Sequence, residues 1–160
     1  MMDYQVGDKV IHATYGLGEI IQMDEKFIHE RQMLCYVVRI RDLTIWVAAD
    51  DAGKSSLRMP TPGSDFENLF TILRSPGALL PMDRFERKTL LFEEMKDGEI
   101  TSICRVIRDL AFYRREKKLN DNDKTTLERA KSFLLAEWMY SLSVSLAQAS
   151  DELMQLLAVG

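Results

Sequence analysis

The first sixty residues alternate between short apolar runs and turn-forming residues, a pattern typical of β-strands. Apolar and β-branched residues recur around 6–11 and at 18–23, 33–40, 43–48 and 56–60. Only the dipeptide "RD" separates the third run from the fourth, which predicts a tight hairpin between them. Five short strands are too few for a sandwich, so we expect a small, strongly bent barrel of the SH3 or Tudor kind.

Two glycines lie between the first two runs, in the stretch "GDKVIHATYGLGEI" (7–20). Gly16 and Gly18 can adopt backbone angles that other residues resist, so we expect a turn or a bulge between paired strands at this point. Barrels of this size usually recognise partners rather than catalyse reactions.

The segment "PTPGS" (60–64) ends the β pattern, because two prolines and a glycine disfavour both a helix and a central strand. We place a domain boundary here, between a β domain at 1–62 and a helical domain at 63–160. Ser64 is expected to cap the first helix, with Glu67 three residues later as in a capping box. The expected fold class is therefore α+β, a small barrel followed by an all-α domain.

Helical periodicity continues through the rest of the chain. Helices are expected at about 83–96, from residue 100 to the turn at 117–123, from that turn onward, and at 151–157. Asn120 is positioned to cap the third of these helices. Apolar residues repeat at spacings of three and four on the inward faces: Ile100, Ile103, Cys104, Ile107, Leu110 and Ala111 in one helix, and Leu127, Ala130, Leu134 and Trp138 in the next.

Composition limits the cellular setting. Of the 160 residues, 46% are hydrophobic, which is enough for packed cores, yet no apolar run approaches the roughly 18 residues of a membrane helix. The first residues lack the basic and apolar regions of a signal peptide. Cys35 and Cys104 lie far apart without a CxxC spacing, which indicates buried thiols rather than a disulfide or a metal site. We expect a cytoplasmic protein with no membrane partner.

The sequence offers little for catalysis. It lacks nucleophile-elbow, phosphate-loop and HExxH motifs, and both histidines, His12 and His29, lie in the β-rich part. Glu93 and Glu94 are adjacent and therefore point to different sides of a helix. We expect no catalytic residue, metal, cofactor or small-molecule substrate, and hence a protein that is not an enzyme.

Binding is better supported. Trp46 turns outward if Ile45 and Val47 face the barrel interior, which makes it a candidate protein contact, although a tryptophan that covers a barrel end fits as well. Residues 84–131 hold 13 basic and 10 acidic residues, while the whole chain has a net charge of −4. Gathered cations suit phosphate contacts, although a solvated helical surface would give the same local excess.

Several segments resemble the CarD family of bacterial transcription regulators. "VGDKVIHATYGLGEI" resembles the N-terminal signature of the family, and "DGEITSICRVIRDL" followed by "REKKLNDNDKTTLERAKSFLLAE" is similar to its C-terminal helices. The resemblance spans about 3–137 and leaves the last twenty residues outside. It implies a Tudor-like barrel that binds the β subunit of RNA polymerase. It also implies helices that touch promoter DNA at the upstream edge of the transcription bubble, where an aromatic wedge, usually Trp, enters the minor groove.

The resemblance also implies roles for single residues. Lys26 matches a basic position for polymerase contact, and Trp46 replaces a residue that is often Arg. Arg84 stands where the family has its Trp wedge. The expected polymerase contacts are therefore Lys26 and Trp46, and the expected DNA contacts are Arg84, Phe85, Arg87, Lys88 and Lys124.

Phe85 is the only aromatic residue next to the wedge position. Apolar burial favours placing its ring in the core by roughly 1.5–3 kcal/mol, so we expect a buried Phe85 and no strong wedge. The inferred function is modulation of open-complex stability by a regulator bound to polymerase and, with little sequence specificity, to promoter DNA, in the cytoplasm and at the nucleoid. The alternative is a protein-interaction adaptor on the same scaffold with little or no DNA contact.

Overall fold

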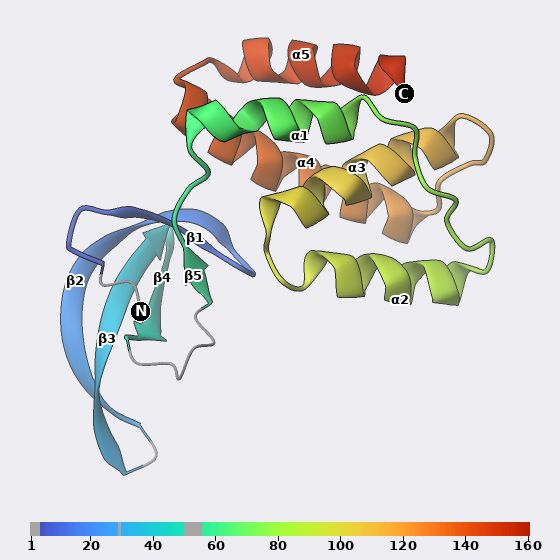
Figure 1. Cartoon of the computed structure of the whole chain (residues 1–160). Coiled ribbons are helices and arrows are strands. Elements are labelled where there is room, and N and C mark those ends of the chain that lie inside the picture. The colour runs from blue at the N-terminus through green and yellow to red at the C-terminus, as the bar shows by residue number, and fades with distance from the viewer. Residues whose placement is uncertain (1–3, 29, 50–55) are drawn as a thin grey trace. The chain divides into compact units, whose positions relative to one another are not determined.

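The computed structural model describes residues 4–28, 30–49 and 56–160 (Figure 1). The chain divides into two compact units, Met1–Pro60 and Thr61–Gly160. The first unit is a β-sheet and the second is a set of helices, as the α+β expectation requires. The division falls two residues before the boundary expected from the prolines at 60–64.

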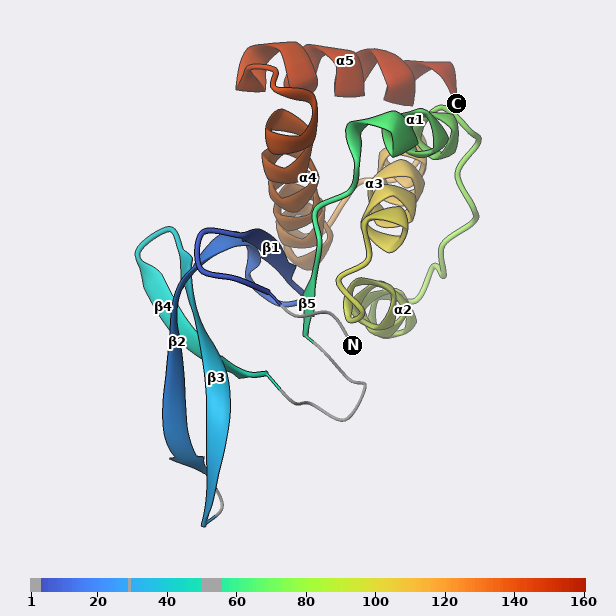
Figure 2. The ribbon, with the colours of Figure 1, turned by 60° about the vertical axis from the view of Figure 1, so that its left-hand side comes forward.

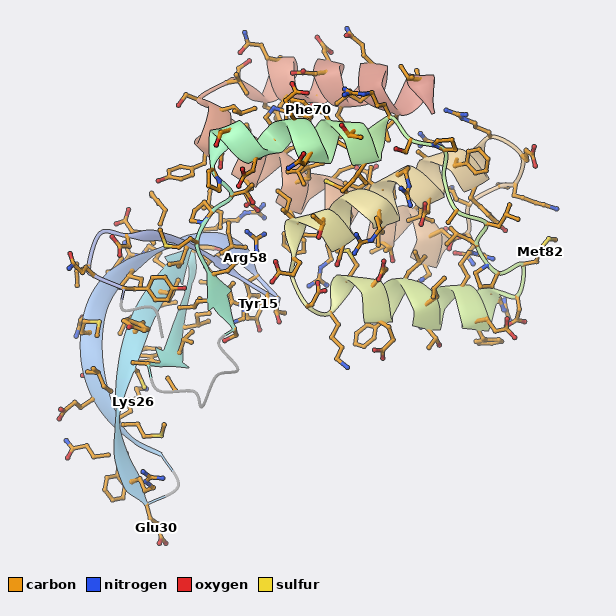
Figure 3. All side chains as sticks on the ribbon, in the orientation of Figure 1. Tyr15, Lys26, Glu30, Arg58, Phe70 and Met82 are labelled. Atoms are coloured by element: carbon orange, nitrogen blue, oxygen red, sulfur yellow. The ribbon has the colours of Figure 1, made fainter. Side chains whose placement is uncertain are left out.

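The first unit is a single antiparallel sheet with the strand order β4-β3-β2-β1-β5. Its strands are β1 (Lys9–His12), β2 (Gly16–Ile28), β3 (Arg31–Ile40), β4 (Leu43–Ala48) and β5 (Leu57–Arg58). β2 and β3 form a long curved ribbon with Glu30 at its tip (Figures 2 and 3). The five strands and the "RD" hairpin are confirmed, but β2 runs five residues beyond its expected end at Met23.

The two glycines at the start of β2 have different roles. Gly16 has a φ of 92°, in the left-handed region that favours glycine. Gly18 lies opposite Val10, and a Cβ there would come within 2.5 Å of Ile40 Cγ1. The chain turns here, as one of the two expected possibilities, and a bulge occurs further along, where the register shifts between Ile20 and Gln22. Gly16 therefore makes the turn, and Gly18 makes room for the core.

One face of the sheet carries the core of the first unit. Its buried members are Tyr4, Val10, Ile20, Tyr36, Val38, Ile40, Val47 and Leu57. The alternating side chains of β1 to β4 point to the other face, which we call the outer face. Two cross-strand rows run across it: Lys9–Glu19–Arg39–Thr44 and Gln22–Val37–Trp46.

The second unit begins with a 3₁₀ turn (Gly63–Asp65) and continues as five helices (Figure 1). These are α1 (Phe66–Leu73), α2 (Arg84–Met95), α3 (Ile100–Arg114), α4 (Asp121–Leu142) and α5 (Leu146–Val159). Asn120 caps α4 through the complete capping box that was expected. The expectation for Ser64 is wrong, because Ser64 lies inside the 3₁₀ turn and Asp65 precedes α1 without a side-chain cap.

The last helix is also longer than expected. Ser145 accepts a hydrogen bond from the backbone of Gln148 and forms a capping box with it, so α5 starts at Leu146 instead of residue 151. Arg115 holds the other end of α5, where its Nη2 donates to the carbonyl oxygen of Leu157 at 2.7 Å and its Nη1 to that of Gly160.

The expected inward stripes of α3 and α4 form the core of the second unit, and Trp138 is fully buried in it. The Trp138 ring packs against Phe66 and Phe70 of α1, with centroid distances of 6.1 and 5.0 Å. Both cysteines are buried free thiols, as expected. Burial, with a smaller contribution from the carboxylate of Glu137, raises the pKa of Cys104 to about 12. In the described part of the chain, no helix has the length and apolar character needed to span a membrane.

Gly18→Ala tests the tight packing at the start of β2. We expect the substitution to destabilise the sheet by about 1–3 kcal/mol, because the new methyl group must displace Ile40 or the backbone oxygen of Arg39, which lies 2.8 Å away. Equilibrium urea unfolding measures the change. Gly63→Ala is the control in the other unit, where the nearest atoms to a new Cβ are Leu142 Cδ2 at 3.0 Å and the backbone oxygen of Ser141 at 3.1 Å, both farther away than the nearest atoms at Gly18. Equal effects of the two substitutions would contradict this account.

Candidate functional site

Two residues singled out for polymerase contact, Lys26 and Trp46, lie against each other on the outer face of the sheet. Trp46 is 45% exposed, which confirms the expected outward orientation. The Nζ atom of Lys26 lies 3.9 Å from the centroid of the Trp46 ring, a cation–π contact that reaches across β3. The outer-face neighbours Cys35 and Val37 are buried. The result is an exposed aromatic ring with a fixed positive charge above it.

A second group of expected site residues lies at the start of α2. Asp83 caps this helix by accepting a hydrogen bond from the Glu86 backbone at 2.9 Å. Arg84 and Lys88 are exposed, and the guanidinium carbon of Arg84 lies 5.0 Å from the centroid of the Phe85 ring. Phe85 itself is 65% exposed, so the expectation that it is buried is wrong.

Arg87 is the second correction, because it faces inward and is only 4% exposed. Its Nε and Nη2 atoms donate to the two carboxylate oxygens of Asp123, at 2.9 and 3.0 Å. Nη1 donates to the carbonyl oxygens of Pro81 and Met82, each at 3.1 Å, and the guanidinium lies 4.8 Å from the centroid of the Tyr113 ring. The hydrogen bonds to Asp123 raise the pKa of Arg87. A side chain with these contacts has no surface to offer to a phosphate.

One cause explains both corrections, namely the rotation of α2 about its axis. Leu91 is buried, and Met95 packs partly buried against the same core. Residues four apart share a helix face, so Arg87 belongs to the face of Leu91 and Met95. Phe85 then points away from the core. The sequence does not reveal this rotation of α2, because Leu90, Leu91 and Phe92 are three successive apolar residues and fit several rotations of the helix.

The Arg87–Asp123 pair joins the first turns of α2 and α4, since Asp123 is also part of the Asn120 capping box. Lys88 and Lys124, the exposed neighbours of these two residues, therefore begin two helices that are tied together. The positive charges of Arg84, Lys88 and Lys124 are matched nearby in sequence by three carboxylates, those of Asp83, Glu86 and Asp121. These six residues by themselves carry no net charge.

Other basic residues of the 84–131 segment are engaged in contacts within the helical unit. Arg105 pairs with Glu94 at 3.2 Å, and Arg108 pairs with Asp109 at 3.0 Å. Arg115 holds α5, as described above. Part of the positive charge read from the sequence is therefore used for internal ion pairs and caps, whereas Arg114, Lys117 and Lys118, at and just after the end of α3, are exposed.

Of the two histidines, His12 lies among the described residues of the first unit. His12 is half-buried near the rim of the sheet, burial lowers its pKa, and its Nδ1 accepts a hydrogen bond from the Thr14 backbone at 3.0 Å. His29 lies outside the described residues. Within the described ranges, no three His, Cys, Asp or Glu side chains gather as a metal site.

Comparison with known families follows the same division of the chain. Residues 68–154 match the family model "CarD, C-terminal domain", and residues 4–59 match the model "CarD-like/TRCF RID domain".

The chain belongs to the CarD family.

A CarD-like relative is the "Putative transcription factor YdeB" of Bacillus subtilis (strain 168). It is 29% identical over 138 residues, which cover 84% of this chain and 89% of the relative. The CarD C-terminal model extends to residue 154, so most of α5 belongs to the family domain. The expectation that the last twenty residues fall outside the family is wrong for this reason.

Sequence reasoning also missed apolar side chains on the surface of α2. Leu90 and Phe92 are exposed there, and Met82, labelled in Figure 3, is exposed in the loop that leads into the helix. The spacing of Leu91 and Met95 was the signal that could have revealed the outward position of Phe92 and Phe85.

Arg87→Met tests the internal role of the arginine. We expect a loss of about 3–5 kcal/mol in the free energy of unfolding, because the buried carboxylate of Asp123 loses its partner. Arg84→Met is the matched control, an exposed arginine on the same turn, and it should change stability by less than about 0.5 kcal/mol. Urea unfolding of both variants gives the comparison.

The double variant Arg87→Met with Asp123→Asn should recover part of the loss, because it leaves no unpaired buried charge and keeps an oxygen for the cap. An Arg87→Met protein as stable as the wild type would contradict the structural role.

Proposed function

We propose that this protein is a transcription regulator that binds the β subunit of RNA polymerase through residues 1–62 and contacts promoter DNA through the helices of residues 63–160. The observation that carries the proposal is the Lys26–Trp46 stack, which lies on the exposed face of a domain that matches the CarD-like/TRCF RID model. The related Bacillus protein is named a putative transcription factor, which agrees with this assignment.

The outer face of the sheet has the properties of a protein-binding anchor. Tryptophan is enriched among the residues that dominate binding energies at protein interfaces. The Lys26 ammonium restricts the Trp46 ring in the free protein, so less conformational freedom is lost on binding. A polymerase segment that covers Trp46 would gain apolar contact with the ring and charge contact with Lys26 together.

The helical surface suits a weak contact with DNA at the edge of opened duplex. Phe85 is exposed at the start of α2, beside the position that holds the Trp wedge in the CarD family. An apolar ring inserted between base steps unstacks them, and Arg84 next to it can follow the narrow minor groove by charge. We therefore assign the wedge to Phe85, with Arg84, Lys88 and Lys124 on the phosphates and Arg87 as an internal residue.

A second function, an adaptor that scarcely touches DNA, is favoured by one observation. Basic and acidic residues balance at the starts of α2 and α4, and Arg87 is buried. The two functions differ in salt dependence, since phosphate contacts release counterions and weaken steeply as salt rises. Complexes with polymerase alone and with polymerase on promoter DNA, titrated over the same salt range, separate them.

Trp46→Ala tests the polymerase contact. We expect binding to core RNA polymerase to weaken by about 2 kcal/mol, because the substitution removes the exposed anchor. Leu43→Ala is the matched control, a partly exposed apolar residue of β4 on the opposite face of the sheet, and it should leave affinity unchanged. Titration calorimetry with a thermal melt of each variant is the measurement. Unchanged affinity in a folded Trp46→Ala protein would return the ring to a structural role.

Phe85→Ala tests the wedge. We expect the variant to melt like the wild type, since the ring is mostly exposed, and to shorten the lifetime of open promoter complexes about tenfold through loss of base stacking. Phe92→Ala removes an equally exposed phenylalanine from the other end of α2 and should leave the lifetime unaltered. Decay after competitor challenge gives the lifetimes. If both substitutions leave the decay at the wild-type rate, the adaptor function is preferred.

A further inference from the structure

The carboxylate of Glu137 is buried in the helical unit and holds the chain just before its first helix. Glu137 lies in the last turns of α4 and is only 2% exposed. Its Oε2 atom accepts a hydrogen bond from the backbone N–H of Thr61 at 2.8 Å, and the two residues are 76 positions apart in the chain. Both belong to the second unit. Hydrogen bonds from a backbone N–H to a carboxylate are stronger than those between neutral groups.

Thr61 is the only residue of the segment 60–62 that has a backbone N–H. Pro60 and Pro62 flank it, and proline has no backbone donor. The carboxylate of Glu137 therefore engages the one backbone donor that this short segment offers.

Two further contacts place the residues after Thr61 along the end of α4. A Cβ on Gly63 would lie 3.0 Å from Leu142 Cδ2 and 3.1 Å from the backbone oxygen of Ser141. The ring of Phe66, the first residue of α1, packs against Trp138. Figure 2 shows this stretch beside the C-terminal end of α4. The stretch is thus fixed to the helical unit before α1 begins.

The sheet ends very close to this stretch. Arg58 is the last residue of β5, which pairs with β1. Two residues, Met59 and Pro60, lie between that strand and Thr61. The ring of Pro60 fixes its own φ. While Glu137 holds Thr61, rotation between the sheet and the helices is therefore limited to the backbone of these two residues.

A carboxylate is a costly side chain for the position of Glu137. Apart from Asp123, which pairs with Arg87, the other buried residues of α4 are apolar: Leu127, Ala130, Leu134 and Trp138. An apolar side chain at Glu137 would pack without the desolvation of a polar group. The bond to Thr61 lies outside every helix and strand, so it extends no secondary structure. Its effect is on the length of chain that can move between the two units.

We propose that Glu137 is a positioning residue for the contact with promoter DNA, because its hydrogen bond to Thr61 keeps the connection between the two units short and stiff. The inference rests on the proposed function, in which polymerase holds the sheet and the helices contact DNA by proximity. The effective concentration of a tethered group falls roughly as the −3/2 power of the length of its tether. A short connection therefore presents the start of α2 to the DNA at a higher effective concentration.

Glu137→Leu tests the role, because it removes the acceptor and keeps a side chain of similar size in the core. The mobile connection then gains Thr61, and the lifetime of open promoter complexes should fall about twofold, as expected for a longer tether. Affinity for core RNA polymerase alone should stay at the wild-type value, because the sheet is unchanged. Glu137→Gln keeps a side-chain oxygen for Thr61 and should retain most of the wild-type lifetime. Glu128→Leu is the matched control, an exposed glutamate of α4, and should change neither quantity.

Amide hydrogen exchange at Thr61, followed by NMR, measures the hydrogen bond itself. Exchange of this amide should be slow in the wild type and in Glu137→Gln, and it should approach the rate of an unprotected amide in Glu137→Leu. Fast exchange at Thr61 in the wild type would overturn the proposal. A thermal melt of each variant shows that the helical unit is folded.

A four-residue Gly-Ser insertion between Pro60 and Thr61 keeps the test independent of the core. It leaves Glu137 and its hydrogen bond in place but lengthens the connection from two residues to six. The lifetime of open complexes should then fall about fivefold, with wild-type melting and slow exchange at Thr61. This variant decides the question even where Glu137→Leu is too unstable to assay. A wild-type lifetime with the insertion would overturn the proposal.

The outcomes also separate this inference from the proposed function. If the wild-type chain does not bind polymerase or does not change the lifetime of open complexes, the proposed function fails and the positioning role fails with it. If the wild type does both and Glu137→Leu matches it despite a fast Thr61 amide, the proposed function stands and the positioning role fails. A lifetime loss in Glu137→Leu that is accompanied by weaker binding to polymerase alone, or that Glu128→Leu shares, would also overturn the positioning role.

Discussion

The buried pair of Arg87 and Asp123 sets the arrangement of the helical surface. A charge buried without a partner is far too costly to retain, so the two side chains must meet wherever their helices lie. Their contact fixes the rotation of α2, joins its first turn to the first turn of α4, and completes the cap of α4 through the same carboxylate. The exposure of Phe85 follows from an ion pair to which Phe85 makes no contribution.

The two units differ in how much of them the sequence could predict. In the sheet, successive side chains of a strand point to opposite faces. A buried Val47 therefore places its neighbour Trp46 on the outer face. In α2, the rotation is decided by Asp123, 36 residues away, and no local pattern records that partner. The sequence did not predict the extension of β2 to Ile28. Asp24, Glu25 and Lys26 show no apolar alternation, and they pair with β3 through the backbone. The start of α5, in contrast, was readable in "SLAQ", where Ser145 and Gln148 have the spacing of a capping box.

The proposed surfaces also differ in how they use charge. On the sheet, one cation, Lys26, lies directly over the exposed Trp46 ring, and Asp24 shares the strand and the face of Lys26. At the helix starts, acids and bases are nearly equal in number, and the most buried arginine is internal. A protein of this design would obtain most of its affinity from the polymerase and would place its helices on DNA by proximity, since a tethered second contact gains from effective concentration. This division agrees with an overall net charge of −4, which would weaken free DNA binding.

Each unit also carries a single buried thiol, Cys35 in the sheet and Cys104 in α3. A thiol reagent attacks the thiolate form of an accessible cysteine, and a Cys104 pKa of about 12 leaves almost none of that form while the helices are closed. Modification at either position thus requires that unit to open. The chain consequently contains one natural reporter for each half, and the rates of labelling at the two cysteines would show which half a bound polymerase or a bound promoter protects, without any added probe.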